Sequence, residues 1–199
     1  IAARLAAYPD LRFKLDAAVG WSAELIDELD ATGAVDVVDF KGQYGIPVPD
    51  EGALVAMYER VLARFPDAHL EDPHELDAVT ELLRPHAARV TYDAPIRTIA
   101  DLDCMTISPG AVNVKPCRVG DLAELLAIYA ACARRGLPIY SGGMGELEIG
   151  RGQAQLLAAM FHADAANDIA PSGYNETPVP DGLPVSPLTP GDAVGFRWG

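Results

Sequence analysis

Short apolar runs alternate with amphipathic stretches along almost the whole chain, and this alternation limits the possible folds more than any other feature. Between the runs, apolar residues recur at helical spacing, as in residues 54–65 and 122–132. Strands that alternate with helices predict a parallel sheet joined by right-handed crossovers. The candidate strands recur about every 22 to 32 residues and lie at 11–16, 35–40, 68–72, 89–95, 111–116, 137–143 and 166–171.

Two α/β architectures satisfy this pattern, an open doubly wound sheet and a closed (β/α) barrel of the TIM type. A doubly wound nucleotide-binding domain needs a glycine-rich phosphate loop after its first strand, and the sequence shows none there. The even rhythm favours a barrel over residues 1–175 that lacks one strand. Residues 176–199 are rich in Pro and Gly without a period, so we expect an extension packed on the barrel.

Composition excludes several classes of partner. A formal net charge of -14 with scattered basic residues argues against a nucleic-acid surface. No apolar run approaches the roughly 20 residues that span a bilayer. Three cysteines, Cys104, Cys117 and Cys132, show no metal-ligand spacing and fit reduced thiols. We therefore expect a soluble cytoplasmic protein with no nucleic-acid or membrane partner.

Five successive strands each place one ionisable residue at the carboxyl end, in the order Lys14, Asp39, Glu71, Asp93 and Lys115. In a barrel these ends form the catalytic face, where side chains from different strands converge. Three carboxylates that meet in one place repel one another unless positive charge lies between them. Oxygen ligands favour a hard cation, so the pattern predicts a site for Mg2+ first and Mn2+ second.

Each of these positions also has a simpler interpretation. A carboxylate at a strand end often caps the next helix, and Asp72 before Pro73 is an obvious candidate for that role. Asp36 is a rival to Asp39 but lies in mid-strand, and Asp16 is a rival to Lys14 but begins a loop. The series of three carboxylates between two lysines favours the metal site, because lysines are improbable at apolar strand ends.

The segments FKLD, VVDFKG, HLEDP, TYDAP and NVKP, in this order, resemble the second to sixth barrel strands of the enolase superfamily. The similarity is to the C-terminal barrels of muconate lactonizing enzyme, o-succinylbenzoate synthase and mandelate racemase, and it extends into GGMGELEIG. It implies that Lys14 and Lys115 are catalytic and that Asp39, Glu71 and Asp93 hold the metal. It also implies that Glu146 occupies the glutamate position of the seventh strand.

The resemblance implies removal of a proton α to the carboxylate of a small molecule, through a metal-stabilised enediolate. Two lysine bases would allow racemisation or epimerisation, and one base would allow cycloisomerisation or β-elimination. These outcomes stay open. Isomerase and lyase activities therefore both remain candidates, and we expect a homo-oligomer as the default for such barrels.

Several residues depart from the family pattern. Arg12 replaces the first lysine of the Lys-x-Lys motif, and we expect it to contribute positive charge near substrate without shuttling a proton. Lys41 and Gln43 stand where the family often has Asn after its metal Asp, and whether Lys41 points into the mouth of the barrel is open. Asp168 keeps the first position of the Asp-x-Asp that holds a dipeptide ammonium, whereas Ala170 loses the second. Glu148, beside the substrate candidate Glu146, fits a solvated helix start.

The first barrel strand and the N-terminal α+β capping domain of the family are absent from this chain, which opens on Ile1 inside a helix-like segment. We therefore expect sequence to have been lost upstream. The incomplete barrel and Arg12 leave a second hypothesis, a non-catalytic metal-binding barrel that serves as a binding or interaction protein. Retention of Lys14 and Lys115 argues against it, because a structural metal site needs neither lysine.

Overall fold

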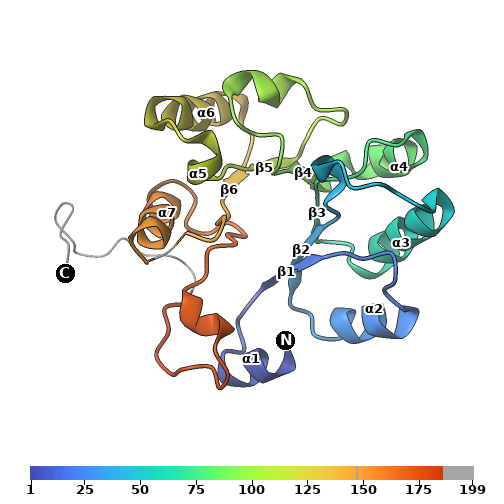
Figure 1. Cartoon of the computed structure of the whole chain (residues 1–199), viewed down its shortest axis with the longest axis horizontal. Coiled ribbons are helices and arrows are strands. Elements are labelled where there is room, and N and C mark those ends of the chain that lie inside the picture. Colours follow the sequence, from blue (N-terminus) through green and yellow to red (C-terminus); the bar gives the residue numbers. More distant parts are fainter. Residues whose placement is uncertain (147, 186–199) are drawn as a thin grey trace.

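A curved sheet of six parallel strands forms the centre of the molecule, and the helices lie outside it (Figure 1). The computed structural model describes residues 1–146 and 148–185. Each strand pairs with the next one along the chain, as in a barrel wall. The strands are β1 (Phe13–Asp16), β2 (Val35–Asp39), β3 (His69–Glu71), β4 (Val90–Tyr92), β5 (Ala111–Asn113) and β6 (Ile139–Tyr140).

Seven α-helices and four short 3-10 helices connect and flank these strands within the described residues. The α-helices are α1 (Ala2–Ala7), α2 (Ala23–Asp30), α3 (Glu51–Arg64), α4 (Asp77–Leu83), α5 (Pro116–Val119), α6 (Leu122–Arg135) and α7 (Glu148–Phe161). The 3-10 helices are η1 (Gly42–Tyr44), η2 (Arg84–Arg89), η3 (Ile99–Asp103) and η4 (Ser172–Asn175). This order confirms the expected α/β barrel architecture. None of the helices found in the described ranges combines the length and apolar character needed to cross a bilayer.

Side chains at the helix ends explain where several helices begin and end. Ser22 accepts a hydrogen bond from the Leu25 backbone and caps α2. Asp50 and Asp121 cap α3 and α6 in the same way. Gly136 ends α6 in the left-handed conformation that glycine adopts without steric cost. Ser22 and Gly136 thus mark where α2 begins and where α6 ends.

Alternation along the strands separates an apolar outer layer from a polar barrel interior. Val38, Leu70, Tyr92 and Val112 belong to one buried cluster with the apolar faces of α3 and α6. Their neighbours on the opposite face include buried polar residues: Asp39, Glu71, Thr91 and Asn113. Because successive strand residues point to opposite faces, one apolar layer holds the helices and the other face is free for polar groups.

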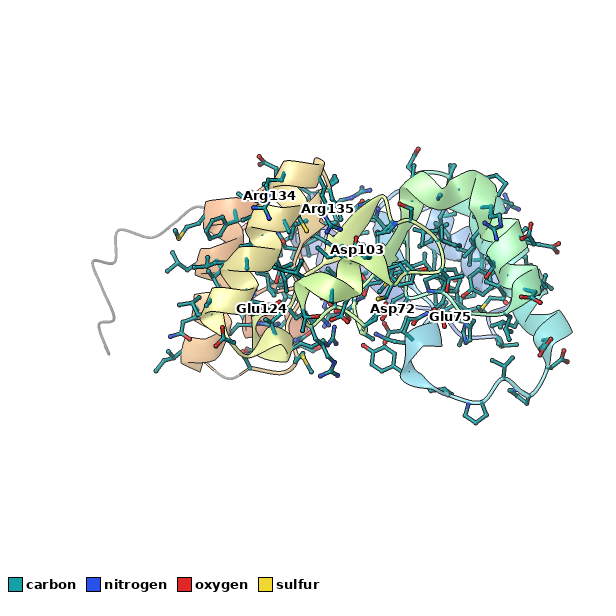
Figure 2. The ribbon with its side chains drawn as sticks, turned by 90° about the horizontal axis from the view of Figure 1, so that it is seen from above. Asp72, Glu75, Asp103, Glu124, Arg134 and Arg135 are labelled. Atoms are coloured by element: carbon teal, nitrogen blue, oxygen red, sulfur yellow. The ribbon has the colours of Figure 1, made fainter. Side chains whose placement is uncertain are left out.

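Contacts between loops and helices hold the outer ring in place. Arg135 near the end of α6 binds Asp103 of η3, with 2.7 Å between Nη1 and Oδ1, and these two side chains lie side by side in Figure 2. Glu124 of α6 accepts a hydrogen bond of 2.8 Å from the Ile99 backbone. The segment between β4 and β5 is thereby fixed to α6.

The seventh candidate strand, 166–171, is not a regular strand, so that prediction is wrong. It forms one isolated parallel bridge, Asp168 with Gly142, through hydrogen bonds of 2.8 and 3.0 Å. The Asn167 side chain bonds its own loop and the Ser141 backbone, and Pro171 lacks an N–H donor. Local bonds of this kind replace a longer ladder.

The ring of strands stays open between β1 and residues 166–171. No ladder hydrogen bond joins these two segments in the part of the chain that the structure describes. A cavity of about 370 Å³ lies between them. On the outside, Tyr8 just after α1 donates a hydrogen bond of 2.5 Å to Pro180 O, so residues 176–185 of the expected extension contact the helical layer; residues 186–199 lie outside the described residues.

Gly42 marks a close approach between two loops at the carboxyl ends of the strands. A Cβ atom there would lie 2.2 Å from the His74 backbone nitrogen, whereas a Cβ at Gly52 in α3 would meet nothing closer than 3.4 Å. We expect Gly42→Ala to lower the free energy of unfolding by about 1–3 kcal/mol. Gly52→Ala should raise it by roughly 0.5–1 kcal/mol because Ala is the better helix former. Urea unfolding of both variants checks this, and equal stability of Gly42→Ala and wild type would contradict the close approach.

Candidate metal and catalytic centre

Asp39 and Glu71 are the last residues of β2 and β3 and lie side by side in register. Asp93 is the first residue after β4. All three are fully buried, with no exposed side-chain surface. The parallel sheet therefore brings the predicted metal ligands to one edge, since the carboxyl ends of parallel strands meet there.

Lys14 occupies the same edge from the neighbouring strand. It lies within β1, which continues to Asp16, and not at its end as expected. Its Nζ atom lies 3.0 Å from Asp39 Oδ2, contacts Glu71 Oε1, and is 3.8 Å from Asp168 Oδ2. One buried amine thus bridges two of the three carboxylates.

Lys115 approaches the cluster from the other side. It follows β5, directly before α5, and its Nζ lies 2.9 Å from Asp93 Oδ2. Arg118, one turn later, contacts Asp93 Oδ1. A Cβ atom at Gly142 would lie 2.6 Å from Lys115 Cε, so the glycine after β6 leaves the room that this side chain needs.

Lys41 also points into the cluster, which answers the question that the sequence left open. Its Nζ lies 2.5 Å from Asp39 Oδ2 and 3.1 Å from Asp16 Oδ1. The chain has only three lysines among its 15 basic residues, and all three contact these carboxylates. Every other basic residue is an arginine.

Asp72 has a role that sequence reasoning assigned incorrectly. It does not cap a helix: α4 begins at Asp77, and the Asp72 carboxylate accepts hydrogen bonds of 2.7 and 3.0 Å from the backbone of Asp93 and Ala94. Its own backbone adopts a positive φ of 47°. Asp72 therefore fixes the turn that presents Asp93, a contact between distant segments that local sequence cannot reveal.

The donor set fits a divalent cation. Carboxylate oxygens of Asp39, Glu71 and Asp72 lie within 4.8 Å of one another, and all three residues are buried. Asp93 stands beside them but is held by Lys115 and Arg118. Hard oxygen donors in such a cluster are the ligands that Mg2+ prefers.

Tyr140, Thr91 and Asn113 form a buried polar network around Glu71 that the sequence analysis did not predict. The Tyr140 hydroxyl donates to Glu71 Oε2 and lies 2.7 Å from Thr91 Oγ1. Asn113 Nδ2 lies 3.4 Å from the same Glu71 oxygen. These groups are buried, so the network leaves Glu71 Oε1 directed toward Lys14. No local signal marks these residues, because their partners lie on other strands.

Burial and neighbouring charges shift the pKa values in opposite directions. Burial raises the pKa of Glu71 to about 8, although Lys14 favours its ionised form. Burial also disfavours ionised Asp39, but Lys14 and Lys41 hold its pKa below the usual range. For Lys14, burial opposes the charged amine, yet Glu71 and Asp39 outweigh it and raise the pKa. Without a metal, the lysine is therefore an acid and not a base.

The predicted substrate-binding residues lie in three different places. Arg12 does not reach the cluster: it binds Asp36 Oδ1 at 2.6 Å and the Gly33 carbonyl at the opposite end of the strands. Asp168 lies at the mouth, half exposed and near Lys14. Glu146 accepts hydrogen bonds of 2.9 Å from the Met144 backbone and 2.6 Å from Cys117 Sγ. The side chain of Glu148 lies outside the described residues.

Comparisons with known proteins agree with this geometry. Residues 1–176 match the family model described as the C-terminal domain of a domain of unknown function, DUF8230. The N-succinylamino acid racemase of Amycolatopsis sp is 28% identical over 203 residues, which cover 89% of this chain and 53% of that protein.

Solved structures show the same fold. The muconate lactonizing enzyme of Mycobacterium smegmatis superimposes with a TM-score of 0.63 at 17% identity, over 84% of this chain and 49% of that one. The dipeptide epimerase of Methylococcus capsulatus, in complex with Mg and the dipeptide L-Arg-D-Lys, gives 0.61 at 22% identity, over 86% and 53%. The chain spans about half the length of these relatives.

The resemblance that the five strand-end motifs carry is thus confirmed, both by sequence similarity across most of the chain and by the barrel wall itself. The chain belongs to the DUF8230 C-terminal domain family and has the barrel fold of the enolase superfamily.

Proposed function

We propose that this barrel binds Mg2+, or Mn2+ in its place, through Asp39, Glu71 and Asp93, and removes a proton α to the carboxylate of a small molecule. The observation that carries the proposal is the convergence of all three lysines of the chain on these buried carboxylates. A solvated acidic surface has no need of amines, and a structural metal site has none either.

Asp93 is preferred to Asp72 as the third ligand because their partners differ. Backbone N–H groups occupy both oxygens of Asp72, and those bonds position the turn at Asp93 and Ala94. The partners of the Asp93 carboxylate are side chains, among them Lys115 and Arg118, which can move when a cation arrives. Removing Asp72 from its backbone bonds costs more than redirecting a long side chain.

Lys14 and Lys115 are the proposed bases. Lys14 comes from β1 beside Asp39, and Lys115 follows β5 beside Asp93, so a substrate between them meets one amine on each side. The cation supplies charge that stabilises the negative charge developing on the substrate carboxylate. Its positive field also lowers the pKa of a nearby lysine, as a base requires.

The relatives suggest the substrate class. Their names include an N-succinylamino acid racemase and a dipeptide epimerase, both of which act on amino-acid derivatives. We propose an N-acyl amino acid or a related carboxylate, with Asp168 and Glu146 as substrate contacts. Arg12 is left out of this proposal because its guanidinium is bound to Asp36 at the far end of the barrel. Racemisation, epimerisation, cycloisomerisation and β-elimination all begin with the same proton removal.

A second candidate function is a metal-binding barrel without turnover. It is favoured by Lys41, which occupies an oxygen of Asp39, and by the open ring between β1 and residues 166–171. Both features weaken a site that must hold metal and substrate together. The two functions differ in one measurable property, exchange of the substrate α-proton.

Proton exchange in D2O tests the catalytic proposal. The protein is incubated with Mg2+ and a panel of N-acyl amino acids, dipeptides and sugar acids, and α-proton loss is followed by NMR. We expect Lys14→Ala or Lys115→Ala to slow exchange by about 100-fold or more, because a positioned base contributes that much. Arg64→Ala, which removes a surface ion pair with Asp27, is the control and should leave exchange unchanged.

Metal-dependent exchange that survives in both lysine variants would contradict the assignment of the bases. Absence of exchange with every substrate, while Mg2+ still binds, would contradict the catalytic proposal and favour the barrel without turnover.

The polar network below Glu71 gives an independent test of the metal site. Tyr140→Phe removes the hydroxyl that holds Glu71 Oε2, and loss of such a partner typically weakens metal binding about 10- to 100-fold. Tyr92→Phe is the matched control, because its buried hydroxyl contacts the Ile107 backbone in the outer layer. Calorimetric titration with Mn2+ measures both. Equal affinities of the two variants would show that Glu71 is not a ligand that Tyr140 positions.

A further inference from the structure

Lys41 and Lys14 share one oxygen of Asp39. The two amines lie 2.5 and 3.0 Å from Asp39 Oδ2. The other oxygen, Oδ1, accepts a hydrogen bond of 2.9 Å from the Lys41 backbone. The carboxylate is therefore saturated by cationic and backbone donors before any metal arrives.

A divalent cation binds carboxylate oxygens at about 2.0–2.1 Å for Mg2+. An ammonium group 2.5 Å from the same oxygen would lie close to that cation, and like charges at short range repel strongly. Lys41 is the more exposed of the two candidates for displacement. Its side chain is 30% exposed and belongs to a loop, whereas that of Lys14 is 8% exposed and belongs to a strand.

Asp16 offers the displaced ammonium a second partner. It is the last residue of β1, lies in register beside Asp39, and is 65% exposed. Lys41 Nζ is already 3.1 Å from its Oδ1. The move from one carboxylate to the other needs only rotation of the lysine side chain, since the Lys41 backbone is held by Asp39 Oδ1.

We propose that Lys41 is an internal competitor of the metal at Asp39, and that Asp16 is the position to which its ammonium moves when the cation binds. This inference rests on the proposed metal site and goes beyond it, because it assigns Lys41 to control of metal affinity and not to catalysis. In the metal-free protein Lys41 compensates a buried carboxylate. In the metal-bound protein it stands at the rim of the mouth beside Asp16.

Mn2+ affinities of four proteins test the proposal: wild type, Lys41→Asn, Asp16→Asn and the double variant. Asparagine suits position 41 because the backbone there has a positive φ of 55°, which Asn tolerates. Lys41→Met serves as a second variant if the first is unstable. Arg64→Gln, which removes one positive charge from the surface, controls for net charge.

We expect Lys41→Asn to bind Mn2+ roughly 10-fold more tightly or better, because a like charge at the ligand oxygen is gone. Asp16→Asn should weaken binding by about threefold, because the ammonium loses an exposed partner. In the Lys41→Asn background, Asp16→Asn should have no effect. Unchanged or weaker binding by Lys41→Asn would overturn the competitor role, and equal effects of Asp16→Asn in both backgrounds would overturn the move to Asp16.

Side-chain NMR gives a second readout. With three lysines, a protein labelled with 15N-lysine has three Nζ signals, which the single lysine variants assign. Mg2+ should shift the Lys41 signal, and Asp16→Asn should change that signal more in the metal-bound state than in the metal-free state, where Asp39 is a second partner. A Lys41 signal unaffected by saturating Mg2+ would overturn the proposal. Tighter Mn2+ binding by Lys41→Asn without any proton exchange would leave this inference standing and remove the catalytic function instead.

Discussion

Compensation of buried negative charge is the constraint on which the rest of this structure depends. Asp39, Glu71 and Asp93 have no exposed side-chain surface, and isolated carboxylates cannot stay ionised in such a place. Lys14, Lys41, Lys115 and Arg118 provide the positive charge from three different parts of the chain. A cluster of this kind is costly for stability alone, since apolar residues of similar size often serve a core equally well. A cluster of this kind is consistent with the metal-binding function proposed above.

The parallel sheet brings the charged side chains of the cluster together at the carboxyl ends of its strands. Each strand contributes one or two groups at its carboxyl end, and the parallel register places Asp39 beside Glu71 without any special loop. Glycine adjusts the fit at Gly142, where Lys115 passes, and at Gly42, where two loops meet. Tyr140 and Thr91 form a polar layer below, so the interior of the barrel orients the cluster in addition to filling space.

Much of this arrangement could be predicted from the sequence because it depends on local periodicity. The strand rhythm and the residues at strand ends follow from alternation of apolar and polar residues, and Ser22 follows from helix capping. Contacts between distant segments could not be predicted. Asp72 looks like a cap, yet its partners lie on the next strand. Arg12 lies two residues before Lys14, where the strand register shifts, and it pairs with Asp36 near the other end of the strands. The seventh strand failed because side-chain bonds of Asn167 replaced the ladder.

The balance of charge around Asp39, Glu71 and Asp93 bears both on stability and on the proposed function. Four cationic side chains contact Asp39, Glu71 and Asp93, and burial raises the pKa of Glu71 to about 8, so the metal-free cluster needs no further positive charge. When a divalent cation enters, two positive charges are added to a site already compensated, and positive charge must leave. An ammonium can leave by moving, as Lys41 can toward Asp16, or by giving up its proton, as a base must before it can act. Under the proposed function, the amines that compensate the buried carboxylates would become neutral bases once a bound cation supplied that compensation. Proton release and metal binding would then be linked. A bound cation lowers the pKa of a nearby lysine, and a lysine that stays protonated lowers the affinity for the cation.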